Sequence, residues 1–194
     1  MGLSVILDIV NLASGTILSG APSGRLLYAK LVAALPDEPA APEPLFLDFG
    51  KVEVATASFL RESVLAFRTF VRGRRSNFYP AIANAPADVI DELVELVQPR
   101  GDVLVICKLT DDGLLLRSGH VGKLDPMQQL TFDLVTRLGR TTATKLMEIA
   151  QSPVKPTAWN NRLASLSNLG VICEQSHGRT KTYSSLFAGG RNGR

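Results

Sequence analysis

The sequence of 194 residues lacks several features that would point to common classes of protein. Its two cysteines, Cys107 and Cys173, lie too far apart for the spacing of a metal site. We therefore expect two reduced thiols in a cytoplasmic protein. No apolar run reaches the roughly 18 residues that a membrane-spanning helix needs. The first ten residues carry Asp8 and no basic residue, which is typical of a strand rather than of a signal peptide.

Catalytic motifs are missing as well. There is no glycine-rich phosphate loop ending in Lys-Ser/Thr, no HExxH and no Gly-x-Ser-x-Gly. The segment 19–24 is rich in glycine and serine but has no lysine, so it is predicted to be a plain loop. Asp111 and Asp112 have no third ligand nearby in the sequence and predict a turn. We expect a protein that is not an enzyme and that has no catalytic residue, metal or cofactor.

The composition is that of a globular chain. Hydrophobic residues make up 45% and charged residues 20%, which excludes wholesale disorder. Aromatic residues make up only 6%, so the core must consist mainly of leucine, valine, isoleucine and alanine. The length fits one large domain or two small ones.

Strand and helix patterns alternate over the first 123 residues. Strands are predicted at residues 3–10, 45–49, 78–83 and 103–108, with an edge strand at 114–117. Helices are predicted at residues 24–35, from about 58 to 71 and from 86 to 98, and a loop is predicted at 11–23. The apolar run 103–108 is typical of a strand that is buried on both faces. This order predicts an α/β domain whose sheet is covered by helices, within a chain that is α+β overall.

Positive charge is concentrated in the remaining part of the chain. Residues 1–123 have 12 Lys and Arg against 14 Asp and Glu, whereas residues 124–194 have 9 against 4. A net charge of +5 over the last third indicates an anionic partner, with nucleic acid as the first candidate.

The C-terminal part predicts three short helices and a hairpin. The helices are expected at 126–138, from Thr141 or Thr142 to 151, and from a cap at Thr157 to Gly170. Two strands at 171–175 and 181–186 enclose a turn at 176–180. This layout is that of a winged helix-turn-helix.

The third helix has a polar face without carboxylates. On a helical wheel its apolar stripe centres on Trp159 and Leu166. The opposite face carries Thr157, Asn160, Asn161, Ala164 and Asn168, with Ser165 at its edge. Asparagine can pair with adenine, and alanine or threonine can meet a thymine methyl group, so this face suits the major groove of DNA. The alternative is a surface helix whose polar face is merely solvated.

Basic residues surround this helix. Arg179 and Lys181 lie at the hairpin turn together with His177, and these side chains are candidates for contacts to a phosphate or the minor groove. Arg140, Lys145 and Lys155 lie near helix ends and are candidates for contacts to the DNA backbone.

Residues 126–187 resemble the winged helix-turn-helix superfamily of bacterial regulators. The segments that carry the resemblance are TTATKLMEIAQ, KPTAWNNRLASLSNLGVI and CEQSHGRTKTYSSL. The resemblance implies a dimeric or dimer-forming DNA-binding domain, in which the third helix reads DNA and the hairpin is the wing.

Residues 3–122 resemble STAS-like bacterial domains of unknown function. The resemblance lies in LFLDFGKVEVATASFLRESV, NAPADVIDELVEL and VLVICK. In the related STAS domains of anti-sigma antagonists, a serine at this helix start can be phosphorylated by an ATPase-fold kinase, and the position corresponds to Ser58 or, less closely, Thr56. The chain has Thr-Ala-Ser-Phe where those antagonists have an Asp-Ser-Ser-Gly type of run. The alternative is an ordinary capping role, since either Ser58 or Thr56 is a natural N-cap of this helix.

Together these patterns predict a STAS-like domain at 1–123, a winged helix-turn-helix domain at 124–187 and a basic tail at 188–194. The predicted function is that of a homodimeric transcription regulator that binds double-stranded DNA, with the first domain as a sensor, dimerisation or partner module. The alternative is an interaction switch that binds a kinase-like ATPase or another regulator, with the winged helix as a docking module. A hydrolase or nucleotide-binding enzyme is supported only by the fold class.

Overall fold

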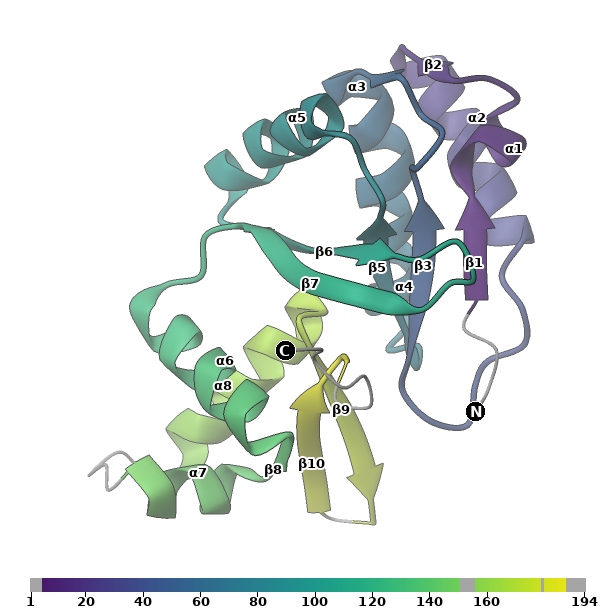
Figure 1. Cartoon of the computed structure of the whole chain (residues 1–194). Helices are drawn as coiled ribbons and strands as arrows, with labels where there is room; N and C mark the ends of the chain where they lie inside the picture. Colours follow the sequence, from purple (N-terminus) through teal and green to yellow (C-terminus); the bar gives the residue numbers. More distant parts are fainter. Residues whose placement is uncertain (1–4, 151–155, 179, 188–194) are drawn as a thin grey trace.

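The computed structural model describes residues 5–150, 156–178 and 180–187, and Figure 1 shows their arrangement. Helices and strands alternate through the first part of the chain, and a smaller group of helices and strands follows. The predicted mixed α/β class is confirmed. None of the described helices is long and apolar enough to cross a membrane.

A five-stranded sheet is the centre of the N-terminal part. Its order is β1-β3-β5-β6-β7, in which the first four strands are parallel and β7 runs antiparallel to β6. The strands are β1 (Val5–Asp8), β3 (Glu43–Asp48), β5 (Phe78–Ala83), β6 (Val103–Leu109) and β7 (Leu115–Gly122). Each parallel strand is added on the same side of the one before it. Right-handed connections then place all the intervening helices on one face of the sheet.

Helices cover that face (Figure 1). They are α2 (Ala21–Ala33), α3 (Ala57–Leu60), the π-helical segment η1 (Arg61–Leu65), α4 (Ala66–Gly73) and α5 (Ala87–Val97), followed by the 3-10 turn η2 (Gln98–Arg100). Their buried side chains share one core with Leu45 and Leu47 of the sheet. Gly24 allows α2 to approach α3 closely, because a Cβ atom there would lie 2.6 Å from the carbonyl oxygen of Phe59.

The predicted loop at 11–23 is wrong. Helix α1 (Ile9–Ala13) follows β1 directly, because the Asp8 carboxylate accepts a hydrogen bond from the backbone N–H of Asn11 (3.0 Å) and so caps the helix. Strand β2 (Ile17–Leu18) then pairs with β4 (Val54–Ala55), and α2 begins at Ala21 with a proline in its first turn. Residues 21–24 of the segment 19–24 are therefore the first turn of a helix, and Gly20 is its N-cap.

The predicted edge strand at 114–117 is longer in the structure. Strand β7 continues to Gly122, because it pairs with β6 from Leu109 back to Val103. The polar residues 117–120 give no strand pattern in the sequence, because the solvent-facing side chains of an edge strand need not be apolar.

The C-terminal part consists of α6 (Pro126–Leu138), β8 (Arg140–Thr141), α7 (Ala143–Ala150), α8 (Pro156–Leu169), β9 (Ile172–His177) and β10 (Thr180–Ser185). The three strands form an antiparallel sheet in the order β8-β10-β9. Asp125 begins α6 with a capping box, and Gly139, with φ of +71°, ends it. The predicted cap at Thr157 is wrong, because α8 already includes Pro156.

The second face of the large sheet is covered by this C-terminal part. Phe46, Tyr79 and Val105 of the sheet share one buried cluster with Trp159 of α8 and Ile172 of β9. Figure 1 shows the C-terminal helices and the small sheet below the strands, on the side away from α2 and α5. The position of α8 is therefore set by packing against the N-terminal sheet.

Candidate nucleic-acid interface

The polar face of α8 lies at the surface. Trp159, Leu163 and Leu166 are buried, so the predicted apolar stripe is confirmed. Thr157, Asn160, Asn161 and Asn168 are exposed, whereas Ala164 and Ser165 are half-buried. This separation leaves a carboxylate-free surface on the described helix, with its N-terminal half the more open.

The Ser165 side chain makes a contact within the C-terminal part of the chain. Its hydroxyl accepts a hydrogen bond from the side-chain amide of Gln128 on α6 (3.2 Å). Ser165 therefore fixes α6 against α8 and marks the border of the exposed face, as the helical wheel predicts.

The hairpin and the start of α7 flank the open half of α8. A groove of about 590 Å³ lies between them, with Thr142 and Thr144 on one side, Asn160 and Asn161 on its floor and Lys181 of β10 on the other side. The described polar groups that line it are hydroxyls, amides and one ammonium group. An anionic surface would meet no carboxylate in this groove.

The basic residues of the hairpin region are held in place. Arg140 donates hydrogen bonds to the side chains of Gln175 (2.8 Å) and Thr182 (3.2 Å), and the ring of His177 lies 3.4 Å from its guanidinium group. Lys181 forms an ion pair with Glu174 (2.7 Å), which neutralises part of the positive charge.

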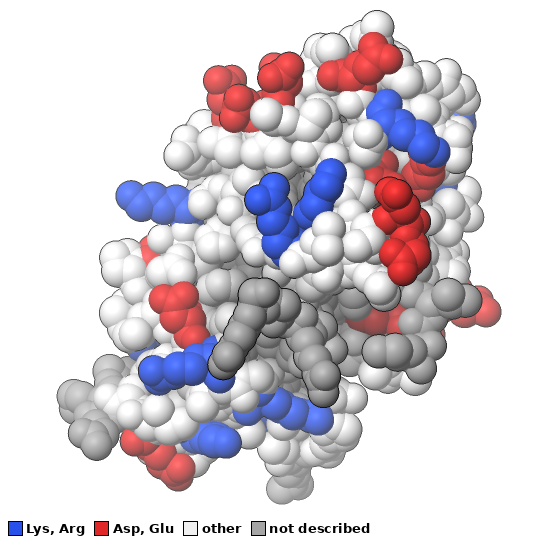
Figure 2. Space-filling view, in the orientation of Figure 1, with Lys and Arg blue, Asp and Glu red and all other residues white. Residues whose placement is uncertain are grey.

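Of the remaining basic candidates, Lys145 lies in the described part of the chain, whereas Lys155 and Arg179 do not. Lys145 is exposed on α7, and its backbone N–H donates to the hydroxyl of Thr142 (3.2 Å), which caps that helix. In the view of Figure 2, acidic side chains occur among the basic ones over the C-terminal helices, so this side of the molecule is not a continuous basic surface.

The N-terminal part contributes arginines that the sequence did not assign to this surface. A groove of about 770 Å³ lies between α4 and α8, and Arg75 lines it opposite Asn161 and Asn168. The run Arg72, Arg74 and Arg75 lies at the C-terminal end of α4, where cations complement the dipole of that helix. No local signal links it to α8, which lies more than 80 residues further along the chain.

Two of the arginines on α4 hold the C-terminal end of α8. Arg72 donates to the carbonyl oxygen of Ser167 (3.1 Å), and Arg68 donates to that of Leu169 (3.4 Å). Cations at this end of a helix satisfy its free carbonyl groups and complement its dipole. Arg68 also forms a close ion pair with Asp102, so α8 is tied to two elements of the N-terminal part.

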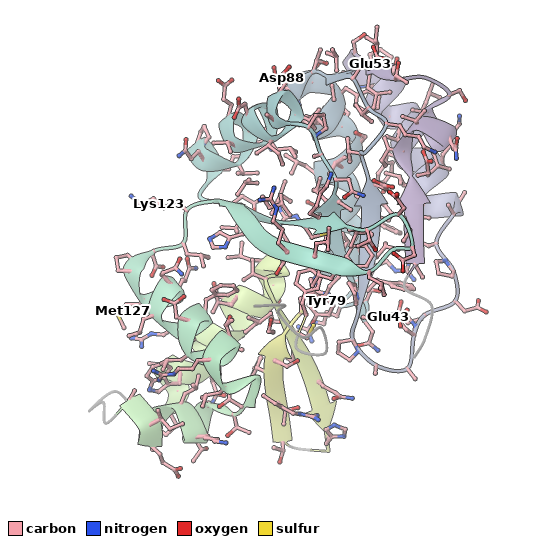
Figure 3. The ribbon with its side chains drawn as sticks, viewed as in Figure 1. Glu43, Glu53, Tyr79, Asp88, Lys123 and Met127 are labelled. Carbon is pink, nitrogen blue, oxygen red and sulfur yellow. The ribbon has the colours of Figure 1, made fainter. Side chains whose placement is uncertain are left out.

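Tyr79 completes this junction. Figure 3 shows it at the end of the large sheet that faces the C-terminal part. The guanidinium carbon of Arg72 lies 3.8 Å from the centre of its ring, and its hydroxyl accepts a hydrogen bond from the backbone N–H of Glu174 (2.9 Å). Tyr79 of β5 therefore contacts β9 directly and supports α8 through Arg72.

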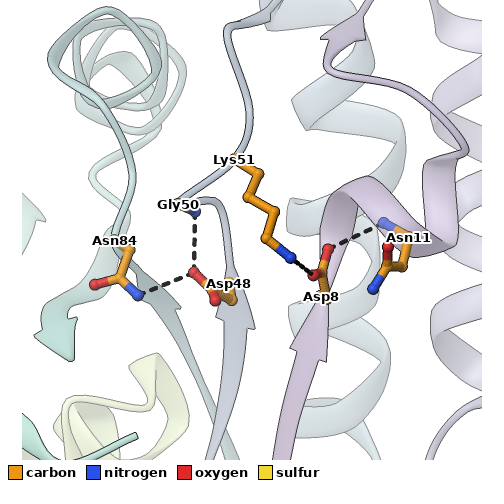
Figure 4. Close-up of polar contacts among 6 residues, drawn as sticks. All are labelled: Asp8, Asn11, Asp48, Gly50, Lys51 and Asn84. Atoms are coloured by element: carbon orange, nitrogen blue, oxygen red, sulfur yellow. Dashed lines mark hydrogen bonds and ion pairs between the residues drawn. The ribbon is translucent and has the colours of Figure 1, made fainter. Parts of the chain in front are cut away.

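Polar side chains at the carboxyl ends of the parallel strands form two separate groups of contacts, one around Asp8 of β1 and one around Asp48 of β3 (Figure 4). Asp48 accepts from the backbone N–H of Gly50 (2.9 Å) and the side-chain amide of Asn84 (3.0 Å). The Asn11 N–H and the Lys51 ammonium group (3.0 Å) lower the pKa of Asp8. No group of three or more His, Cys, Asp or Glu side chains in the described part could hold a metal ion.

Ser58 does not cap the helix that contains it. The N-cap position is Thr56, which makes no side-chain cap bond and instead accepts from the backbone N–H of Gly20 (3.3 Å). The Ser58 hydroxyl is half-buried and lies 3.3 Å from that of Thr56. Of the two predicted N-caps, Ser58 is therefore wrong and the N-cap position falls on Thr56, because the helix starts at Ala57, two residues earlier than a cap at Ser58 would give.

Cys107 and Cys173 are free thiols, as expected, and both are buried. Burial raises the pKa of each to about 12, so neither is a reactive thiolate. Asp111 and Asp112 lie in the turn that precedes β7.

The chain matches no protein-family model, no curated protein sequence and no solved structure.

Proposed function

We propose that the protein is a DNA-binding transcription regulator of the bacterial cytoplasm that reads duplex DNA with α8. The observation that carries the proposal is the exposed, carboxylate-free face of α8 beside the β9–β10 hairpin. The order helix, strand, helix, helix, strand, strand, with the small sheet arranged β8-β10-β9, supports the resemblance to winged helix-turn-helix domains. The STAS-like domain would then serve as the sensor or dimerisation module.

Base contacts are assigned to the open half of α8. Asn160 and Asn161 would pair with adenine edges, and Thr157 would contact a base or a phosphate. Ala164 and Asn168 line the grooves between α4, α8 and the hairpin, and the half-buried Ala164 would meet a thymine methyl group only where the groove admits it.

Backbone contacts are assigned to the exposed cations around that helix. Lys181 lines the groove on one side of α8, and Arg75 lines the groove between α4 and α8. Lys145 of α7 and Arg140 of β8 are the other exposed cations assigned to this role. Two copies of the chain would place their reading helices about 34 Å apart on a palindromic site.

Binding to a pool of short duplexes, followed by fluorescence anisotropy at several salt concentrations, tests the proposal. Asn161→Ala is expected to reduce discrimination between bases by about 1–3 kcal/mol. Lys145→Gln and Arg75→Gln are each expected to weaken binding to all sequences and to lower the salt slope by about one unit. Arg100→Gln is the matched control. Arg100 is an exposed arginine on η2, at the C-terminal end of α5, and it is not one of the cations to which DNA contacts are assigned. Absence of salt-sensitive binding by the wild-type protein would contradict the proposal.

The alternative, an interaction switch centred on Ser58 that binds an ATPase-fold regulator, rests on the sequence alone. An intact-mass measurement on protein from its native host tests it, because phosphorylation would add a phosphate that Ser58→Ala removes.

A further inference from the structure

We propose a second binding site, for a small anion with an apolar body, between α5 and the strands β6 and β7. A pocket of about 360 Å³ opens there, on the face of the sheet that carries the helices. This volume lies at the lower end of the range for small-ligand pockets. The pocket adjoins the carboxyl ends of β5 and β6, the edge at which open α/β sheets bind ligands.

The floor of the pocket is apolar and incompletely covered. Ile82 of β5 pairs in register with Ile106 of β6, which pairs with Gly119 of β7. Ile106 lies in an interior strand and is nevertheless only half-buried, because the residue opposite it has no side chain. Ile90 of α5 forms the facing wall. Such a surface would accept an aliphatic or aromatic group.

The rim of the pocket carries two cations. Lys108 and Arg117 lie directly opposite each other in the β6–β7 register, and both are exposed. Like charges at opposed positions destabilise a strand pair. No ion pair between described residues includes either side chain. Figure 2 shows basic side chains next to one another at the centre of the view, where Figure 1 shows β6 and β7.

An anionic group would remove that repulsion. A carboxylate or sulfonate between the two side chains would accept charge-assisted hydrogen bonds from both. The nearby amide of Asn84 does not compete for the ligand, because it donates to Asp48 (3.0 Å) and accepts from the backbone N–H of Leu109 (2.9 Å). The chemistry of the pocket therefore selects an amphipathic anion over a neutral molecule of the same shape.

The test uses the full chain and the aromatic sulfonate 1-anilinonaphthalene-8-sulfonate as a fluorescent probe. We expect one saturable site per chain, from which octanoate displaces the probe at lower concentrations than octanol does. Lys108→Gln and Arg117→Gln should each weaken binding of the probe by about tenfold, the effect of one lost charge-assisted hydrogen bond. Arg100→Gln, the control for a nonspecific effect of charge, should bind as the wild type does.

Gly119→Val tests the apolar floor. A Cβ atom at Gly119 has as its nearest neighbour an Ile106 side-chain carbon at 3.9 Å, so a larger side chain would project into the cavity without displacing backbone. This variant should lose saturable binding while its circular dichroism stays unchanged. If it does not fold, the two charge variants decide the matter, because both side chains are exposed. Equal displacement by octanol and octanoate, or wild-type affinity in both charge variants, would overturn the proposal, and neither result depends on DNA binding.

Discussion

The ion pair between Arg68 and Asp102 is expected to stabilise the junction of the two parts of the chain. The Arg68 side chain is 11% exposed and that of Asp102 is 20% exposed, so both charges are largely removed from water. Arg68→Met removes one charge, leaves the other without its partner and deletes the bond to the carbonyl oxygen of Leu169. Breaking a fully buried pair costs about 3–5 kcal/mol, and the remaining exposure of Asp102 reduces our expectation to about 2–3 kcal/mol.

Two further variants separate this effect from a general loss of charge. Arg61→Met breaks an exposed ion pair with Glu62 on the same helical stretch and should cost less than about 1 kcal/mol. Combining Arg68→Met with Asp102→Asn should recover most of the lost stability, because the amide oxygen can still accept the bond from the backbone N–H of Val103.

Urea unfolding measures these differences with two probes. Trp159, the only tryptophan of the chain, is buried in the cluster shared by the two parts, and far-ultraviolet circular dichroism follows all helices. Since that cluster joins both parts, the two transitions should coincide in the wild type. The reasoning would be refuted if Arg68→Met unfolded at the same urea concentration as Arg61→Met.

Three other predictions follow from single residues. Tyr79→Phe should cost about 1–2 kcal/mol in urea unfolding, because the backbone N–H of Glu174 loses its acceptor. Burial lowers the pKa of His120 below its ordinary value of 6.5, so the folded protein binds this proton less readily than the unfolded chain does. The free energy of unfolding should therefore fall as the pH drops through 6.5. His120→Leu should flatten this dependence, as measured by urea titrations at pH 7.5 and 5.5. Cys107 and Cys173, whose pKa values burial raises to about 12, should react with Ellman's reagent at pH 8 only after unfolding, and rapid labelling of the native protein would contradict their burial.

The elements that the sequence predicted well are those whose signals are local. Strand β5 and helix α6 have the predicted bounds, and α5 agrees to within a residue or two. The two helices have periodic apolar residues bounded by proline or glycine, and β5 is an apolar run between Asn77 and Asn84. Helix α1 and strand β2 were missed because short elements leave little periodicity. The cap at Asp8 that begins α1 lies inside an apolar run that looks like one strand.

The candidate surfaces were predictable only in part. The polar face of α8 follows from helical spacing alone, and its exposure agrees with the wheel. The docking of α4 on the end of α8 depends on Arg68 and Arg72, which contact residues about 100 positions away. The opposition of Lys108 and Arg117 likewise depends on the register of a hairpin, and the sequence predicted only the first residues of its second strand.

The alternation of side chains along β6 separates the two proposed sites. Val105 and Cys107 belong to the buried cluster that supports α8, whereas Ile106 and Lys108 alternate with them and line the proposed anion pocket, which Cys107 also borders. A substitution at Lys108 therefore alters no side chain that contacts α8. Loss of DNA binding in Lys108→Gln would mean that the sheet transmits a change from one face to the other. Unchanged DNA binding, with a weakened anion site, would mean that the two faces act independently.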